Sequence, residues 1–164
     1  MTRSLVFQVV VGLWLTLLAG TATAQRERPT TRQMRDRAEA AMKDLSGKVR
    51  FDDFPSKLMA RDVRFAAYTP PGYDDPANKD KRYPVIFFLH GLFESPERWV
   101  MRGGMKFIDD PIKAKEFPPC VLVVADGGTS FYCDTKDGKQ PYGRFYIEEF
   151  VPFVDRTFRT FGDR

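Results

Sequence analysis

The sequence predicts an α/β fold, and three features of its 164 residues support that prediction. Residues 83–89 and 121–125 are apolar on both faces, as is typical of strands covered on both sides in a mostly parallel sheet. A helix start at 95–97 lies between these runs, and an amphipathic helix is predicted at 145–158. Strands that alternate with helices indicate βαβ units with right-handed crossovers.

The first 24 residues predict a cleaved export signal. Arg3 supplies a short positive region, residues 5–18 are apolar and uncharged, and residues 22–24 have the small-x-small form that signal peptidase cuts. We therefore expect cleavage near Ala24 and a secreted or periplasmic protein. An uncleaved membrane anchor is the alternative. No second apolar run of spanning length follows, so we expect no membrane association after cleavage.

Residues 25–50 are predicted to form a helical leader ahead of a partial α/β domain at 51–164. Apolar residues recur in the leader at helical spacing, after a threonine cap (Thr30 or Thr31) and before Gly47. This pattern indicates a short amphipathic helix that packs on the outside of the domain.

The domain itself begins with a predicted strand at 58–68, whose period of two indicates that it is half-buried. Pro70-Pro71-Gly72 ends this strand. Helices are predicted to start at Ser95-Pro96 and at Asp110-Pro111, where a capping side chain precedes proline. Residues 126–142 show no period, which indicates a long loop.

The last predicted helix, 145–158, is expected to kink at Pro152. Its inward-facing residues are predicted to be Tyr146, Ile147, Phe150, Val151, Val154 and Phe158.

The candidate site lies on the loops that begin at His90 and Asp126, because open α/β sheets bind ligands beyond the carboxyl ends of their strands. The first loop reads His-Gly-Leu-Phe-Glu-Ser and the second Asp-Gly-Gly-Thr-Ser-Phe-Tyr-Cys-Asp. Gly91 allows the backbone to turn sharply off a buried strand, which leaves the next amide free to face a ligand oxygen.

These motifs resemble the esterase D group of the α/β-hydrolase superfamily, which includes S-formylglutathione hydrolases, feruloyl and acetyl-xylan esterases, and secreted mycolyltransferases. The resemblance runs from about residue 58 to 164. It is carried by Tyr-Thr-Pro-Pro-Gly-Tyr (68–73), Tyr-Pro-Val-Ile-Phe-Phe-Leu-His-Gly-Leu (83–92), a Trp-bearing helix, Asp-Gly-Gly-x-Ser-Phe-Tyr (126–132) and Phe-Tyr-Ile-Glu-Glu-Phe-Val-Pro-Phe-Val-Asp (145–155). It implies the N-terminal half of an α/β-hydrolase fold, a serine nucleophile and no cofactor.

The resemblance also implies that the Leu92 backbone N–H is one oxyanion-hole donor, with His90 and Gly91 forming its turn. The family's nucleophile lies in a GxSxG elbow on a later strand, and the acid and base of its triad follow. No serine of this sequence has glycine two residues before and two after it, and His90 is the only histidine. His90 as general base is the alternative role.

We therefore expect the N-terminal fragment of an exported serine carboxylic-ester hydrolase, which by itself lacks the triad, is inactive and folds poorly. An acyltransferase of the same fold, resembling the mycolyltransferases, is one alternative. A non-catalytic binding or vestigial domain is the other. The expected substrate is a small-molecule or carbohydrate-linked ester.

Aromatic and hydroxyl side chains near the two loops are candidates for the substrate pocket. For Phe93, Trp99, Phe131 and Tyr132 the alternative is ordinary packing, since aromatic residues make up 14% of the chain. Ser130 is a candidate for a substrate hydrogen bond, or for one within its own loop.

Charge and cysteine content exclude other classes of function. The formal net charge is +4, and basic residues are interspersed with acidic ones, so we expect no nucleic-acid partner. One histidine and two distant cysteines do not form a zinc ligand set, so no metal is expected. We expect Cys120 and Cys133 to stay separate, because a disulfide would require the intervening loop to fold back along the strand.

Overall fold

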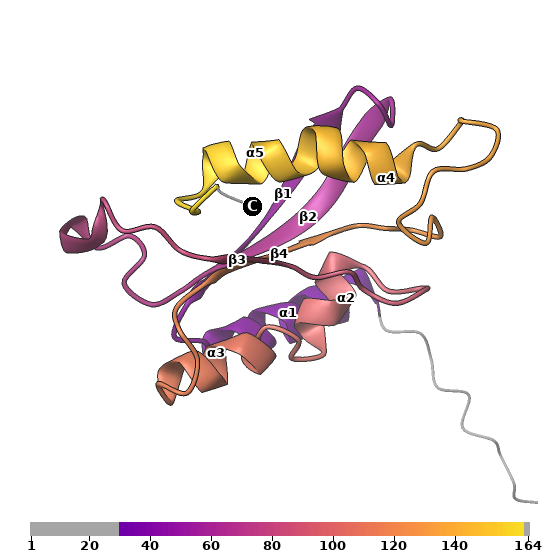
Figure 1. Ribbon diagram of the computed structural model, residues 1–164. Helices are drawn as coiled ribbons and strands as arrows, with labels where there is room; N and C mark the ends of the chain where they lie inside the picture. Colours follow the sequence, from indigo (N-terminus) through magenta and orange to yellow (C-terminus); the bar gives the residue numbers. More distant parts are fainter. Residues whose placement is uncertain (1–29, 163–164) are drawn as a thin grey trace, which may run out of the picture.

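The computed structural model describes residues 30–162, so the predicted signal peptide lies outside the described residues. A four-stranded sheet lies between two helical layers, with α1, α2 and α3 on one side and α4 and α5 on the other (Figure 1). The elements are α1 (Thr31–Lys43), β1 (Lys48–Ser56), β2 (Arg61–Thr69), the 3-10 turn η1 (Pro76–Asn78), β3 (Val85–Phe87), α2 (Pro96–Met101), α3 (Lys106–Lys113), β4 (Val121–Ala125), α4 (Tyr142–Arg144), the π-helical stretch η2 (Phe145–Phe150) and α5 (Val151–Thr157).

The sheet is mixed, with strand order β1-β2-β4-β3. β1 and β2 form an antiparallel hairpin, and β2 is also antiparallel to β4. β3 and β4 are parallel and are joined through α2 and α3, which is the predicted βαβ unit. The α/β class is therefore confirmed, although parallel pairing within the described residues is confined to β3 and β4.

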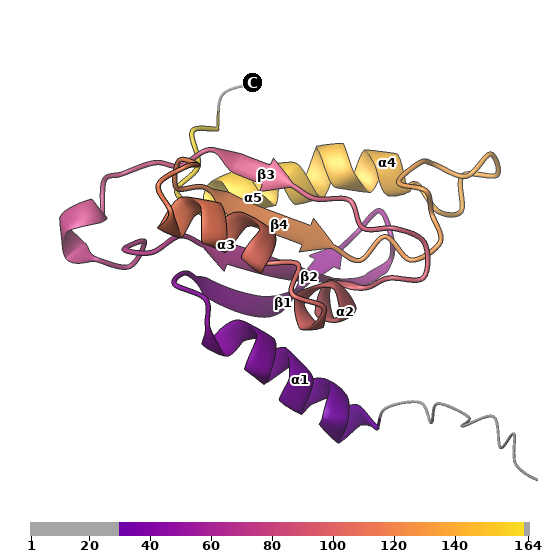
Figure 2. The same ribbon diagram turned by 90° about the horizontal axis from the view of Figure 1, so that it is seen from below.

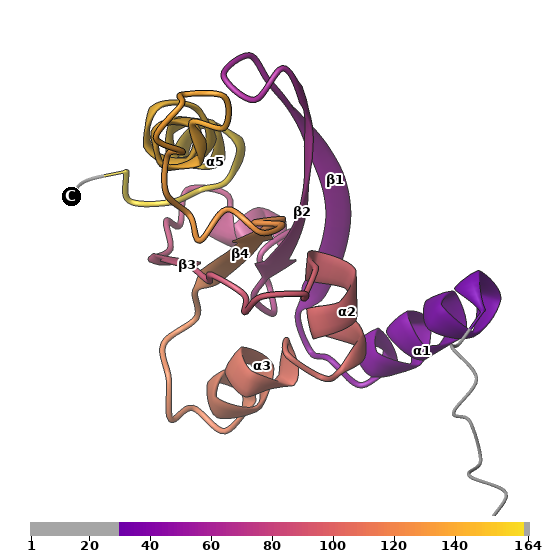
Figure 3. The ribbon, with the colours of Figure 1, turned by 90° about the vertical axis from the view of Figure 1, so that its right-hand side faces the viewer.

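β2 is buried on both faces, so the predicted half-buried strand was wrong on this point. Val63, Phe65 and Ala67 pack beneath the α4–α5 layer, while Ala66 and Tyr68 pack against the α2–α3 layer. The strand lies between β1 and β4, where helices cover both sides of the sheet (Figure 3). Pro70-Pro71-Gly72 follows directly after β2 ends at Thr69, as predicted.

β1 was not predicted from the sequence. Val49 and Phe51 begin an alternation that the charged pair Asp52-Asp53 and then Pro55 interrupt. The strand tolerates these residues because it is the edge of the sheet, where charges and proline are common. β1 begins at Lys48, inside the range assigned to the helical leader.

The predicted N-terminal helix is present as α1. The Thr30 side chain accepts from the Gln33 N–H, and the Gln33 side chain accepts from the Thr30 N–H, which makes a capping box. α1 lies on the outside of the molecule, on the side of α2 and α3 (Figure 2). Met42 and Leu45, at and beyond its end, pack against the core cluster on this face.

α2 starts as predicted, but the predicted helix start at Asp110-Pro111 is wrong. The Ser95 side chain caps α2 by accepting from the Arg98 N–H. α3 instead begins at Lys106 and contains Pro111 within its length. Asp109 is the reason that this helix is positioned differently, because its carboxylate is buried and holds the α1–β1 connection.

The Asp109 carboxylate is surrounded by hydrogen-bond donors from two segments, the α1–β1 connection and β2. It accepts from the Ser46 N–H at 2.9 Å, the Gly47 N–H at 2.8 Å and the Tyr68 hydroxyl at 2.9 Å. The Ser46 hydroxyl also donates to it. Burial by itself raises the pKa of a carboxyl, but these donors outweigh it, so the pKa of Asp109 is lowered.

The last helix differs from its prediction in register. η2 is π-helical, with i→i+5 hydrogen bonds that widen the turn, so a period of 3.6 residues misplaces its side chains. Ile147 was predicted to face inward and is exposed, whereas Phe145 is fully buried. Tyr146, Phe150, Val151, Val154 and Phe158 are buried as predicted. η2 ends at Phe150, two residues before Pro152. Figure 1 shows η2 and α5 as one continuous rod, without the kink that was predicted at Pro152.

The two cysteines are separate, as expected. Cys120 is buried in the core cluster beneath α2 and α3, and Cys133 is exposed on the long loop. Burial raises the pKa of the Cys120 thiol to about 11. Among residues 30–162, the helices are all too short or too polar to cross a bilayer.

Candidate active site

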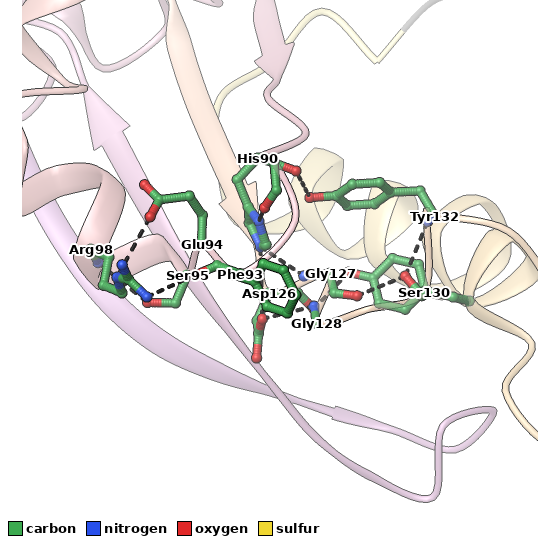
Figure 4. Close-up of polar contacts among 12 residues, drawn as sticks. His90, Phe93, Glu94, Ser95, Arg98, Asp126, Gly127, Gly128, Ser130 and Tyr132 are labelled. Atoms are coloured by element: carbon green, nitrogen blue, oxygen red, sulfur yellow. Dashed lines mark hydrogen bonds and ion pairs between the residues drawn. The ribbon is translucent and has the colours of Figure 1, made fainter.

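The two predicted loops meet at one edge of the molecule. They leave the sheet after β3 and β4, whose carboxyl ends point the same way because the strands are parallel (Figure 1). Figure 4 shows His90 from the first loop pointing at the second, where it meets Gly127 and Tyr132. The predicted juxtaposition of the two loops is therefore present.

His90 connects the two loops through both of its ring nitrogens. The side chain is buried, and its Nε2 accepts a hydrogen bond from the Gly127 N–H at 2.9 Å. Because Nε2 is the acceptor, Nδ1 carries the proton and donates to the Gly91 carbonyl oxygen at 2.9 Å. The Asp126 carboxylate is 3.7 Å from Nε2 and accepts from the Gly128 N–H instead. The Nε2 lone pair, which a general base would need, is thus already occupied by the hydrogen bond from the Gly127 N–H.

The Gly91 carbonyl in turn sets the direction of the Leu92 N–H. This oxygen accepts from His90 Nδ1 and, at 3.1 Å, from the Glu94 N–H. A trans peptide directs its C=O and its N–H to opposite sides. The Leu92 N–H therefore points away from these donors, and no group in residues 30–162 accepts from it.

The turn Gly91–Glu94, which carries this amide, is strained and is stabilised by arginine side chains of the segment that follows it. Phe93, its third residue, has φ 64°, a left-handed value that favours glycine. The Arg98 guanidinium donates to the Phe93 carbonyl at 2.8 Å and forms an ion pair with Glu94 (Figure 4). Glu94 also forms an ion pair with Arg102. These contacts keep the Phe93 side chain outside the core, with 73% of its surface exposed.

Tyr132 closes the second loop over the first. Its hydroxyl donates to the His90 carbonyl at 2.9 Å, and burial raises the pKa of Tyr132 to about 12, so the proton stays in place. The ring lies so close to Gly127 that a Cβ there would approach it to 2.6 Å. Gly127 is therefore required for the close packing that lets its N–H reach His90.

Ser130 uses its hydroxyl within its own loop. The hydroxyl donates to the Gly127 carbonyl at 2.7 Å and accepts from the Tyr132 N–H at 3.0 Å. This is the local arrangement named as the alternative to a substrate contact.

The remaining predicted pocket residues divide into two groups. Trp99 stacks on Phe88 with ring centroids 4.4 Å apart and packs into the core cluster beneath α2 and α3. Leu92, Phe93 and Phe131 are exposed on the loops. Sequence reasoning missed Glu94, Arg98 and Gly127. The i,i+4 spacing of Glu94 and Arg98 across the α2 cap was the signal available for the first two.

Phe131 provides a test of strain in the second loop. Phe131 and Tyr132 have φ values of 53° and 58° in the middle of the turn that joins Ser130 to Cys133, where glycine or asparagine is preferred. We expect Phe131→Gly to raise the free energy of unfolding by about 1 kcal/mol, because it relieves left-handed strain. Phe131→Val, which is β-branched, should lower it by a similar amount. Urea denaturation measures both, and equal effects would contradict the strain.

The contacts of His90 predict that replacing this side chain destabilises the protein. His90→Ala leaves the buried Gly127 N–H without its acceptor, so we expect the free energy of unfolding to fall by about 1 to 3 kcal/mol. Tyr132→Phe keeps the imidazole and removes only the hydrogen bond of the Tyr132 hydroxyl, so it should lower the free energy of unfolding by about 1 kcal/mol. Denaturant titration compares the two, and a His90→Ala protein as stable as the parent would refute the connecting role.

The chemistry available at this site is that of a hydrogen-bond donor held ready for an anion. Within residues 30–162, histidine, cysteine and acidic side chains do not gather in the groups of three or more that a metal ion needs. The direction of the Leu92 N–H is instead fixed by its own peptide, and this N–H has no acceptor among the described residues. A prearranged backbone donor of this kind stabilises a developing oxyanion.

Comparisons with known proteins identify the family of this chain. The family model described as "Putative esterase" matches residues 56–164, which is more than half of the chain. An endo-1,4-beta-xylanase/feruloyl esterase of Xylanibacter ruminicola is 28% identical over 131 residues, covering 76% of this chain and 18% of that protein.

Solved structures show the same likeness. A ferulic acid esterase matches with a TM-score of 0.65 and 26% identity, over 74% of this chain and 47% of its own. An S-formylglutathione hydrolase from Agrobacterium tumefaciens matches with a TM-score of 0.56 and 20% identity, over 71% and 46%. The chain thus spans less than half the length of these relatives. It belongs to the esterase family of the α/β-hydrolase superfamily.

Proposed function

We propose that this chain forms the oxyanion side of a serine carboxylic-ester hydrolase that works through an acyl-enzyme. The observation that carries the proposal is the Leu92 N–H, which has no acceptor within the described residues and is oriented by the Gly91 carbonyl. The proposal assigns the nucleophile and the rest of the triad to residues of the full-length protein other than these 164. It requires no cofactor.

In this role the Leu92 N–H acts on the tetrahedral intermediate. When the nucleophile adds to the ester carbonyl, negative charge develops on the carbonyl oxygen. His90 Nδ1 and the Glu94 N–H hold the Gly91 peptide in place beforehand, so the donor needs no reorganisation at that moment. A second amide, next to the nucleophile, completes the oxyanion hole in this mechanism.

For the substrate we propose an ester of an aromatic acid attached to a carbohydrate. The names of the xylanase/feruloyl esterase and of the ferulic acid esterase support this class. Phe93 and Phe131 support it as well, because both are exposed aromatic side chains on the loops around the Leu92 N–H. Flat aromatic groups stack on such side chains.

We also propose that the protein is exported through its first 24 residues. Arg3, the apolar stretch 5–18 and the Ala-Thr-Ala at 22–24 support this. N-terminal sequencing of the protein recovered from the periplasm or medium should begin at Gln25. Recovery of a protein that still begins at Met1 in the cytoplasm would exclude export.

The proposed function is tested by the coding sequence beyond Arg164 and by the activity of its product. We expect a GxSxG motif soon after Arg164, and hydrolysis of methyl ferulate by the product that is lost when that serine is changed to alanine. The 164-residue chain expressed alone should show no turnover. A stop codon directly after Arg164 would instead favour the non-catalytic domain.

A further inference from the structure

Tyr142, the first residue of α4, donates a hydrogen bond to the second loop from within the core. The residue is fully buried, and its ring packs edge-on against Tyr132 and Phe145, with centroids 5.5 and 5.1 Å away. Its hydroxyl donates to the Asp126 carbonyl oxygen at 2.8 Å. Burial raises the pKa of Tyr142, so the hydroxyl keeps its proton and remains a donor.

The Asp126–Gly127 peptide connects Tyr142 to His90. This peptide is trans, so its C=O and its N–H point to opposite sides. The C=O accepts from Tyr142, and the N–H donates to His90 Nε2 at 2.9 Å (Figure 4). The peptide is therefore hydrogen-bonded on both sides, by groups from α4 and from the first loop.

His90 continues the series to the Leu92 N–H. Its Nδ1 donates to the Gly91 carbonyl oxygen at 2.9 Å, and the Leu92 N–H lies on the opposite side of that peptide. Four groups are thus joined, namely the Tyr142 hydroxyl, the Asp126–Gly127 peptide, the His90 ring and the Gly91–Leu92 peptide. We call them the hydrogen-bond relay. Each group accepts on one side and donates on the other, in the same direction throughout, and no proton needs to move.

Hydrogen bonds that run in one direction strengthen one another. A bond to the oxygen of an amide draws electrons from its nitrogen, which makes the N–H a better donor, and a bond to one nitrogen of a neutral imidazole acts in the same way on the other. Such polarisation adds about 10 to 30% per bond. His90 is only 3% exposed and Tyr142 is fully buried, so little water screens the effect.

We propose that Tyr142 is a positioning residue of the oxyanion hole, which acts through the hydrogen-bond relay to fix and polarise the Leu92 N–H. The inference rests on the proposed function, because that function makes the Leu92 N–H an oxyanion donor. Tyr142 itself contacts Asp126 on the second loop and not the reacting ester.

The two neighbouring tyrosines lie outside the relay. The Tyr132 hydroxyl donates to the His90 carbonyl, and the N–H of that peptide belongs to Gly91 and not to Leu92. The Tyr146 hydroxyl has no hydrogen-bond partner in the described part of the chain. Among these three buried tyrosines, Tyr142 is therefore the one whose hydroxyl is aligned with the oxyanion donor.

Steady-state kinetics of the full-length esterase test the relay. Tyr142→Phe should lower kcat by about two- to fivefold with little change in KM, because it weakens a donor that acts in the transition state. Tyr68→Phe is the matched control. It removes a buried hydroxyl that donates at 2.9 Å to Asp109, on the other face of the sheet, and should leave kcat unchanged. Equal kcat values for the two variants would overturn the inference.

A double-mutant cycle separates the relay from a merely structural role of Tyr142. His90→Ala interrupts the relay between Tyr142 and Leu92. In that background we expect Tyr142→Phe to change kcat by less than about 1.5-fold. The same fold loss from Tyr142→Phe with and without His90 would overturn the inference, because it would show that Tyr142 acts independently of the imidazole.

Nuclear magnetic resonance gives a readout that does not depend on activity. In the full-length protein, nitrogen-15 shifts should place the His90 proton on Nδ1, and a proton on Nε2 would overturn the relay. Tyr142→Phe should move the amide protons of Gly127 and Leu92 upfield. Tyr146→Phe removes a hydroxyl from the same aromatic cluster and should leave both amide shifts in place. Equal shifts in the two variants would also overturn the relay.

The two proposals fail in different ways. Serine-dependent hydrolysis of methyl ferulate with equal kcat values for Tyr142→Phe and Tyr68→Phe would overturn the relay and leave the esterase function standing. A full-length protein without such hydrolysis would overturn the esterase function and the catalytic role of Tyr142 with it, whatever the amide shifts show.

Discussion

Leu92→Pro should lower kcat of the full-length esterase by about 10²- to 10³-fold, with little change in KM. Proline removes the one N–H that the proposed oxyanion hole takes from this chain. The turn itself should survive, because Leu92 is the second residue of the Gly91–Glu94 turn and proline is favoured at that position. Steady-state kinetics with an aryl ester measure the effect, and circular dichroism checks that the fold is kept.

Leu92→Ala is the matched control for this experiment. It removes most of the same side chain, which is already 48% exposed, and retains the backbone N–H. We expect kcat to stay within a few-fold of the parent enzyme. A Leu92→Pro enzyme that keeps its kcat would show that the oxyanion donor lies elsewhere, and equal losses in both variants would assign the effect to the side chain.

Asp109→Ala should lower the free energy of unfolding by about 3 to 5 kcal/mol. The substitution leaves the Ser46 N–H, the Gly47 N–H and the Tyr68 hydroxyl without their acceptor in a buried place. Asp110→Ala is the control, since this neighbour on α3 is 58% exposed and pairs only loosely with Lys106. We expect Asp110→Ala to lower the free energy of unfolding by less than about 0.5 kcal/mol. Denaturant titrations of both variants that gave equal midpoints would contradict the prediction.

The same carboxylate predicts how stability depends on pH. The pKa of Asp109 is lowered in the folded state, so its contribution is complete above the pKa of the unfolded chain and is lost as the pH falls through the folded value. Asp109→Asn cannot ionise, so it should be less stable than the parent at neutral pH and should lose less stability on acidification. Unfolding free energies measured from neutral to acidic pH test this, and parallel curves for the two proteins would refute it.

Much of the fold was predictable because local chemistry decided it. The apolar stretch 121–125, the Ser95-Pro96 helix start and the Pro70-Pro71-Gly72 stop each act over a few residues, and all three are present in the structure. β1 was missed because an edge strand tolerates charges and proline. The start of α3 was misplaced because Asp109 acts through partners more than 40 residues away in the chain.

The sequence by itself determined the α/β class, the two loops of the candidate site and the turn at His90-Gly91, since each follows from apolar runs and glycine positions within one short segment. Only the tertiary structure decided that His90 joins Gly91 to Gly127, that Tyr132 closes over it and that Ser130 serves its own loop. These contacts depend on the parallel pairing of β3 with β4, which brings residues 37 to 42 positions apart to within hydrogen-bond distance. Periodicity within one segment carries no information about such pairs, because the partner that orients each group lies on the other loop.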